Sequence, residues 1–467
     1  MNIKSIKNAG SAKLGTFGGV FTPSLLTILG VIMYLRFGWV VGNVGLIGTL
    51  LIVTLSTTIT FLTSLSISAI ATNAPVKGGG AYFLISRSLG AEIGGAVGIP
   101  LYLAQAFSVS LYVIGFSESV VAIFPALDMK WVGIVTTLAL GGLALFSTTA
   151  TIKSQFFIMG LIALSLLSLI FGSPMEDSNV ELWGVPAAQS VDFWQVFAIF
   201  FPAVTGIMAG VNMSGDLKNP SKSIPKGTFM AIGVGYLIYM VLPVILAGRA
   251  DASTLIDNPL IMQDIAIWGG AIVLGIWGAT LSSATGSLLG APRVLQALAN
   301  DKILPKWARV FSKVGGKEKI PRAATLFTIA ITLLTVYFGN LNLIAPVLTM
   351  FFLTTYAVLN ITAATERFLG SASFRPKFKV HWVFSLLGAL GCAGVMFLIN
   401  ALATLMAFLV IGVIFVWLER RKIEATWGGL GRGVFSSIIR YALFRLEKES
   451  NAKSWRPNIL VLSGSPG

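Results

Sequence analysis

The chain contains about twelve apolar stretches, each long enough to cross a bilayer core, which requires roughly 20 helical residues. Lipid offers the backbone no hydrogen-bond partners, so a spanning segment must satisfy its own N–H and C=O groups, as an α-helix does. The pattern therefore predicts an all-α membrane protein. The predicted spans lie near residues 16–41, 44–72, 94–124, 131–150, 154–172, 193–215, 225–248, 262–290, 322–339, 342–366, 382–400 and 402–420.

Composition and charge placement agree with this reading. Of the 467 residues, 55% are hydrophobic and 11% charged, and the mean hydropathy of +0.85 fits no soluble class. The net charge of +15 could suggest nucleic acid, but all of the 33 Lys and Arg except Arg36, Lys130 and Arg249 lie in the two tails or the even-numbered connections. That is the positive-inside pattern, so we expect an integral protein of the plasma (inner) membrane with both termini cytoplasmic and no nucleic-acid partner.

Several classes of site and segment are excluded by what the chain contains. A single cysteine, Cys392, and a single histidine, His381, leave no disulfide scaffold and no Cys/His metal site. The sequence has no phosphate-binding loop, so the chain by itself is not an ATP-driven pump, and no cofactor is expected. The first apolar segment is long, broken and without a small-residue cleavage site, which argues against a signal peptide.

Two of the spans are interrupted by Pro and Gly. Pro202, Gly206 and Gly210 interrupt the sixth span, and Pro23 and Gly30 interrupt the first, five spans earlier. Backbone freed at bilayer depth is tolerated only where protein or a watery cavity surrounds it. A matched pair of broken spans is the usual sequence sign of a secondary transporter's substrate site. The alternative is an ordinary kink whose Thr side chains bond back to their own helix.

Each break would present polar backbone groups of both signs. Helix starts carry free N–H groups that attract anions, and free carbonyls suit hard cations. The carbonyls near Ile28, Leu29 and Pro202 would be joined by the hydroxyls of Thr27 and Thr205. The candidate amide donors are Gly30, Val31 and Ile32 in the first span and Gly206, Ile207 and Met208 in the sixth.

Other polar residues inside the spans are open to two interpretations each. Ser282 and Ser283 in span eight could bind a small cation or could simply allow close helix packing. Tyr112 and Tyr356 lie deep in apolar segments, where a phenol requires either an interhelical hydrogen bond or an ion.

Arg36 and Glu118 are rare charges of opposite sign toward the outer ends of spans one and three. Intramembrane charges are costly and usually paired. We expect a salt bridge that closes the outer mouth, the alternative being two separate snorkelling side chains.

Several long motifs resemble the cation-chloride cotransporters of the amino acid-polyamine-organocation superfamily. They are residues 29–42 (LGVIMYLRFGWVVG), 68–73, 78–90, 201–217, 225–228, 291–298 and 455–457. The resemblance implies a LeuT-like fold of two inverted five-helix repeats with broken helices one and six, followed by two extra helices. It also implies electroneutral symport of chloride with potassium, sodium or both, and a possible homodimer.

The resemblance also assigns roles to individual residues. For potassium it implies Ile28, Tyr112, Pro202 and Thr205, with Thr27 beside them. For chloride it implies Gly30, Val31 and Ile32 at one site and Gly206, Ile207, Met208 and Tyr356 at the other. For sodium it implies Leu29, Ala279, Ser282 and Ser283, and for the outer gate Arg36 and Glu118.

The chain departs from the family at two places. The first is Thr27, which stands where the family normally has Asn, so a hydroxyl replaces a longer amide beside the potassium site.

The second is the C-terminus, where residues 454–467 resemble only the beginning of the family's cytosolic domain. Before it we expect a cytoplasmic tail over 1–15, the transporter domain over 16–422 and a basic amphipathic cytoplasmic helix within 423–453.

The leading hypothesis is therefore an alternating-access symporter of chloride with potassium and sodium, whose partners are these ions and the lipid bilayer. A sodium-independent potassium-chloride symporter fits the paired serines less well. An amino-acid or polyamine permease of the same fold is the main alternative, although such permeases usually carry Gly-x-Gly at the first break, where this chain has only Gly30. An intramembrane enzyme would need clustered titratable residues near the midplane, and the sequence shows none.

Overall fold

The computed structural model describes residues 14–73, 79–146, 149–175, 182–183, 191–315, 320–368 and 374–421. The side chains of 146, 149–153 and 216 are outside this description. The predicted cytoplasmic helix within 423–453, the segment 454–467 and nearly all of the predicted tail over 1–15 also lie outside the described residues.

The described chain is almost entirely helical, which confirms the predicted all-α membrane class. Eight helical segments are long and apolar enough to cross a membrane, and Met129–Leu145, Ser154–Ile170 and Arg322–Phe338 are shorter apolar helices. The long elements are α3 (Phe37–Asn73), α5 (Ala91–Ile123), α6 (Met129–Phe146), α7 (Thr149–Ile170), α10 (Pro220–Ala247), α13 (Gly269–Asn300), α14 (Arg322–Phe338), α15 (Leu341–Phe368) and α16 (Trp382–Arg420).

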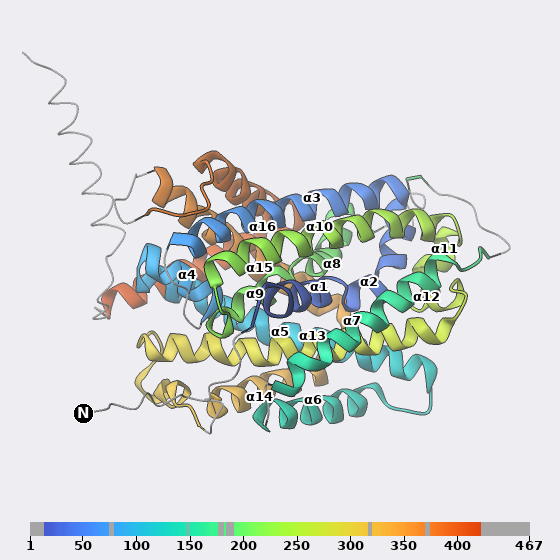
Figure 1. Cartoon of the computed structure of the whole chain (residues 1–467), viewed down its shortest axis with the longest axis horizontal. Helices are drawn as coiled ribbons and strands as arrows, with labels where there is room; N and C mark the ends of the chain where they lie inside the picture. Colours follow the sequence, from blue (N-terminus) through green and yellow to red (C-terminus); the bar gives the residue numbers. More distant parts are fainter. Residues whose placement is uncertain are drawn as a thin grey trace, which may run out of the picture.

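Short elements fill the centre and the connections. They are η1 (Phe17–Phe21), α1 (Thr22–Ile28), α2 (Val31–Leu35), α4 (Gly80–Leu89), α8 (Phe193–Phe200), η2 (Phe201–Val204), α9 (Ile207–Asn212), η3 (Ser214–Asp216), α11 (Ala252–Asp257), α12 (Ile261–Asp264) and η4 (Lys306–Ser312). Figure 1 shows α1, α2, α8 and α9 in the middle of the view, with α3 and α10 on one side and α13, α14 and α6 on the other.

Both predicted breaks are present. The first span divides into α1 and α2 at Leu29 and Gly30, whose backbone is not helical. The sixth divides into α8, the 3₁₀ turn η2 and α9. The apolar segments that contain these breaks are 89% and 83% buried, against 11% for α16. Protein therefore surrounds the freed backbone, as the absence of hydrogen-bond partners in lipid requires.

Two long helices contain sharp turns of the chain. Gly45 in α3 has φ of 69°, a left-handed conformation that a glycine adopts at little cost, and it lies at the predicted junction of spans one and two. Asn400 interrupts α16 between the predicted spans 382–400 and 402–420. The hydroxyl of Thr404 donates to the carbonyl of Met396 at 2.7 Å, eight residues earlier. A straight helix would separate such residues by about 12 Å, so the chain turns at Asn400.

The predicted limits of span eight were wrong. The helix α13 runs from Gly269 to Asn300 instead of 262–290, and Pro292 lies inside it. Surrounding helices can compensate for a buried proline in a membrane helix, so the helix continues past Pro292. The helix ends at Asn300; two residues later Lys302, with φ of 58°, reverses the chain, and the amide of Ile303 donates back to the carbonyl of Leu298 at 3.0 Å.

The central helices pack closely enough for backbone to meet backbone. α1 contacts α9, α10 and α13, while α13 also packs along α5 and α7. A Cβ atom added to Gly206 would lie 2.7 Å from the amide nitrogen of Ile28 and 2.8 Å from the carbonyl oxygen of Ser24. The two broken spans therefore meet at Gly206, where no larger side chain fits.

We expect Gly206→Ala to lower the thermal midpoint of the protein in detergent, because the added methyl group must push α1 away from the second break. Overpacking of this kind costs about 1–3 kcal/mol. Gly233→Ala is the matched control, since nothing lies within 4 Å of its added Cβ. The midpoint can be followed by the monodisperse fraction that survives heating. Equal midpoints for the two variants would contradict the close approach of the two spans.

Candidate functional site

A polar cavity lies where the two breaks meet. Its wall includes Thr27 from α1, Tyr112 from α5, and Thr205, Gly206 and Met208 from the second break, and it holds about 290 Å³ of empty space. The remaining wall residues are Gln105, Ser108, Ala209, Gly286, Ser287 and Phe352. The structure thus gathers around one space five residues that the sequence had placed in three different spans.

The two threonines at the breaks bond back to their own helices. The hydroxyl of Thr27 donates to the carbonyl of Pro23, and that of Thr205 donates to the carbonyl of Pro202, both at 2.8 Å. This is the arrangement that the sequence had left open as the alternative to ion binding. A hydroxyl oxygen that donates its proton in this way keeps its lone pairs, so each can still accept from a ligand or bind a cation.

The carbonyl of Thr205 accepts two hydrogen bonds. The hydroxyl of Tyr356 donates to it at 3.1 Å from α15, and the amide of Met208 donates at 3.3 Å. Tyr356 is fully buried, so this bond satisfies its phenol. The Met208 amide, expected as an anion donor, is engaged here in a long bond.

The carbonyl of Ile28 is held from the opposite side. The hydroxyl of Tyr239, fully buried in α10, donates to it. Gly235 permits this approach, because a Cβ there would lie 2.7 Å from Cγ2 of Ile28. Ile28 and Tyr239 line a second small cavity with Thr57, whose buried hydroxyl has no partner in the described part of the chain.

The paired serines of α13 lie against α1. Ser283 donates to the carbonyl of Leu26 at 3.3 Å, while Ser282 lines the vestibule described next. Ala279 is fully buried one turn earlier in α13. The α1 carbonyl that meets the serines in this structure is therefore that of Leu26, three residues before the predicted Leu29.

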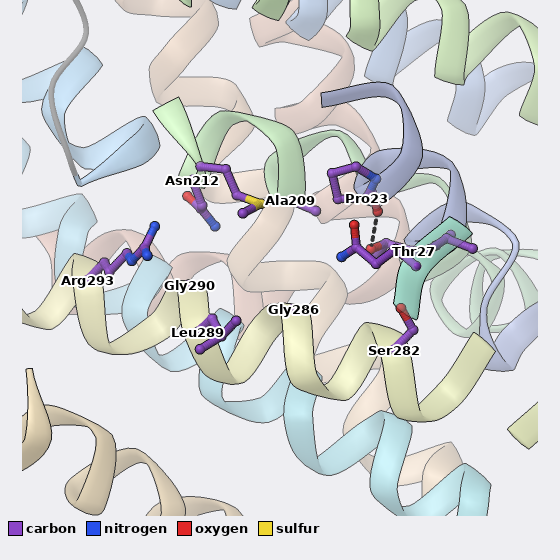
Figure 2. A pocket seen from close by; sticks show the side chains of 12 residues that line it. Pro23, Thr27, Ala209, Asn212, Ser282, Gly286, Leu289, Gly290 and Arg293 are labelled. Carbon is purple, nitrogen blue, oxygen red and sulfur yellow. Dashed lines mark hydrogen bonds between the residues drawn. The ribbon is translucent and has the colours of Figure 1, made fainter. Parts of the chain in front are cut away.

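A larger cavity, here called the vestibule, continues from Thr27 toward Arg293 (Figure 2). It shares Thr27, Ala209 and Gly286 with the cavity at Tyr112. Its walls come from α1, α7, α9 and α13, and it encloses about 490 Å³, part of it open. The vestibule thus joins the space between the breaks to the Arg293 end of the molecule.

Two buried amide oxygens belong to residues of the vestibule wall. Oε1 of Gln155 and Oδ1 of Asn212 have no hydrogen-bond partner among the described residues. A buried carbonyl oxygen without a partner is costly, so water or a cation is the expected occupant. The vestibule wall therefore combines two buried amide oxygens with apolar side chains such as Leu26 and Leu289.

The helix α4 borders the Arg293 end. A Cβ on Gly80 would lie 2.1 Å from Oδ1 of Asn212, and the hydroxyl of Tyr82 donates to Asp301 at 2.7 Å. Burial, reinforced by the Asp301 charge, raises the pKa of Tyr82 well above its ordinary value. The phenol therefore stays protonated and keeps α4 bonded to the end of α13.

At the opposite end, Arg36 and Glu118 form the ion pair that the sequence suggested. Nη1 and Nη2 of Arg36 donate to Oε1 and Oε2 of Glu118 at 2.8 and 3.0 Å. Nε of the same side chain donates to Oδ1 of Asn342 at 2.9 Å. This bidentate contact joins α2, α5 and α15; that it acts as a gate stays a prediction.

The other predicted binding residues lie at or beside the two breaks but do not line the cavity at Tyr112. Leu29 and Gly30 form the non-helical junction, and a Cβ on Gly30 would lie 3.5 Å from the ring of Tyr112. Val31, Ile32 and Ile207 are buried in the packing. The described residues hold no group of three or more His, Cys, Asp or Glu that could bind a metal cofactor.

Comparison with known proteins assigns the chain to a family. A family model described as "Amino acid permease" matches residues 19–461. The chain belongs to the amino acid permease family. It is also 32% identical to human (Homo sapiens) solute carrier family 12 member 2 over 98% of its own length and 43% of that protein.

Further members of solute carrier family 12 match equally well. Member 1 of Mus musculus is 33% identical over 98% of this chain and 47% of its own length, and member 9 of Danio rerio is 32% identical over 97% and 56%. These matches confirm the family resemblance drawn from the motifs. The chain spans about half the length of the relatives it matches.

Sequence reasoning missed four residues of this permease-family site: Leu26, Gln155, Tyr239 and Asn342. Leu26 contributes only its carbonyl, and its apolar side chain gives no sign of this. Gln155, Tyr239 and Asn342 are polar residues at or inside apolar stretches, the same signal that singled out Tyr112. What the sequence lacked was the identity of the partner, which for Tyr239 lies 211 residues away.

We expect Tyr239→Phe to destabilise the protein, because the buried carbonyl of Ile28 would lose its donor. A buried acceptor left unpaired costs about 1–3 kcal/mol. The thermal midpoint in detergent should fall, whereas Tyr236→Phe should leave it nearly unchanged, since that hydroxyl contacts Thr54 at an exposed position. A Tyr239→Phe protein as stable as wild type would show that the Ile28 carbonyl does not depend on the phenol.

Proposed function

We propose that the chain is a secondary active symporter that moves chloride with potassium and sodium by alternating access. The observation that carries the proposal is the meeting of two broken helices around a polar cavity, with the paired serines of α13 against the first of them. Similarity to solute carrier family 12 over nearly the whole chain supports it.

A twelve-span, inverted-repeat topology is part of the proposal. The eight long apolar segments and three shorter ones give this number once α16 is counted as two spans divided at Asn400. The breaks then fall in spans one and six, at corresponding positions of two five-helix repeats. The last two spans would be the extra pair, and the basic connections would be cytoplasmic.

In this proposal potassium binds between Tyr112 and the two breaks. Tyr112 is buried and lines the cavity with Thr27 and Thr205. The carbonyls of Ile28 and Pro202 would complete the oxygen ligands. Both accept protein hydroxyls here, so an ion would share or replace those bonds. Thr27, shorter than the family's Asn, would contact the ion through water.

Chloride would bind the amides that follow each break. The candidates are Gly30, Val31 and Ile32 at one site, and Gly206, Ile207 and Met208 with the Tyr356 hydroxyl at the other. The bond of the Met208 amide to Thr205 is long, so exchange for an anion costs little. An adjacent potassium ion would offset the cost of desolvating chloride.

Sodium would bind between α13 and α1. The hydroxyls of Ser282 and Ser283 with the carbonyls of Leu29 and Ala279 supply oxygen ligands, and the carbonyl of Leu26 lies 3.3 Å from Ser283. Hard cations prefer such a set.

The proposed gate and the vestibule fit one state of an alternating-access cycle. The bidentate Arg36–Glu118 pair would close one end, while the vestibule leads from Thr27 toward Arg293. With basic connections on the cytoplasmic side, this state would open inward.

Two alternatives remain on the same fold. A sodium-independent potassium-chloride symporter is equally compatible with the matches to solute carrier family 12. An amino-acid or polyamine permease is favoured by the description of the matching family model. All three are transporters, and none requires an enzyme's catalytic groups.

Flux through proteoliposomes tests the proposed function. We expect rubidium uptake to require chloride and sodium, and chloride uptake to require rubidium or potassium together with sodium. Uptake should be electroneutral, so it should not respond to an imposed membrane potential. Uptake of an amino acid without chloride dependence would favour the permease, and uptake of both ions without sodium would favour the sodium-independent symporter.

The sodium site is tested by Ser282→Ala combined with Ser283→Ala. Loss of two oxygen ligands should raise the sodium concentration for half-maximal rubidium uptake at least tenfold, or abolish sodium dependence. Thr285→Ala is the control, because this hydroxyl bonds to Leu281 in its own helix. Unchanged sodium dependence in the double variant, with the protein correctly folded, would remove the serines from the site.

A further inference from the structure

The 3₁₀ helix η4 (Lys306–Ser312) has three chemically distinct faces. Side chains three residues apart eclipse one another in a 3₁₀ helix. Lys306 and Arg309 therefore share one face, Trp307 and Val310 a second, and Ala308 and Phe311 a third. The segment is basic on one face, apolar and exposed on another, and buried on the last.

The buried face fixes η4 to the ends of two membrane helices. The ring of Phe311 packs on that of Phe327 in α14, with centroids 5.1 Å apart, and η4 also contacts α13. One residue before Phe327, Leu326 is 57% exposed on the apolar helix α14. An exposed leucine on a membrane helix faces lipid, so η4 lies at the depth where lipid tails give way to headgroups.

The described residues leave the exposed apolar face largely uncovered. Trp307 is 72% exposed and Val310 44%, and the ring of Phe311 lies edge-on to the indole with centroids 6.4 Å apart. Tryptophan is enriched at membrane interfaces because its ring is apolar while its N–H remains polar. This face therefore fits the boundary of a bilayer rather than water.

The basic face lies in a segment whose charged residues are all positive. Residues 302–315 include Lys302, Lys306, Arg309 and Lys313 and no Asp or Glu. Lys306, Arg309 and Lys313 are exposed. A basic cluster beside an interfacial tryptophan is complementary to an anionic headgroup.

We propose that η4 and Lys313 form a binding surface for anionic phospholipid in the bilayer that surrounds the protein. Trp307 and Val310 contact the upper acyl chains, and Lys306, Arg309 and Lys313 contact the headgroup phosphate. The surface follows directly after α13, the helix that carries Ser282 and Ser283. It does not depend on which ions the protein transports.

Tryptophan quenching by brominated lipid tests this surface in the full chain. The protein is reconstituted in phosphatidylcholine containing the same small fraction of brominated phosphatidylglycerol or of brominated phosphatidylcholine. Subtracting the signal of a Trp307→Phe protein isolates Trp307 from the other tryptophans. We expect brominated phosphatidylglycerol to quench Trp307 at least about threefold more than brominated phosphatidylcholine, because basic residues near the surface attract anionic lipid.

Charge variants determine whether the basic face causes this preference. Lys306→Gln with Arg309→Gln and Lys313→Gln should bring the quenching ratio to about one, and high salt should have the same effect. Lys218→Gln with Lys222→Gln and Lys226→Gln removes equal charge from exposed lysines whose segment carries no exposed large apolar side chain, and should preserve the ratio.

A charge-conserving variant and a competition experiment separate lipid binding from misfolding and from phosphate binding. The charge-conserving pair Lys306→Arg and Lys313→Arg should retain the preference, which separates loss of charge from misfolding. Inorganic phosphate should compete no better than chloride at equal ionic strength. A wild-type ratio of one, an unchanged ratio in the triple Gln variant, or specific competition by phosphate would each overturn the proposal.

Discussion

The structure depends on how the backbone groups freed by the two helix breaks find hydrogen-bond partners at bilayer depth. Lipid supplies none, so neighbouring helices must. Tyr239 of α10 donates to the carbonyl of Ile28, and Tyr356 of α15 donates to that of Thr205. The breaks therefore constrain the helices around them. α10 and α15 must each place a buried tyrosine hydroxyl at the centre. Position 206 must be glycine so that the two broken spans can contact each other.

The same requirement makes the breaks suitable for ions. A carbonyl that accepts a hydrogen bond from a hydroxyl would exchange this bond for a contact with the cation. Replacing one polar partner with another changes the free energy little. In this structure the hydroxyls of Thr27 and Thr205 and the phenol of Tyr239 all donate to backbone carbonyls. Protein hydroxyls thus pair carbonyls near both breaks, and in the proposed function an ion would displace or join these hydroxyls.

Much of this arrangement could be predicted from local sequence signals. Hydropathy predicted the spans, and the Pro and Gly residues placed both breaks, because these signals act within one helix. The end of α13 was misplaced, because the helix continues through Pro292 to Asn300. The roles of Leu26 and Tyr239 were missed for a related reason: their partners, Ser283 and Ile28, lie 257 and 211 residues away. Pairings over such separations leave no local pattern.

The short helix α2 links the break in the first span to the ion pair between Arg36 and Glu118. It has only five residues, between Gly30 at the break and Arg36, and neither flanking residue is helical. Arg36 is bound by Glu118 of α5 and Asn342 of α15, whereas the amide oxygens of Gln155 and Asn212 at the vestibule have no partner among the described residues. Because the residues on both sides of α2 are not helical, the helix is not continued into either neighbour. A movement at the break would therefore shift Arg36 directly, and a tilt of α2 would require Arg36 to give up its ion pair with Glu118.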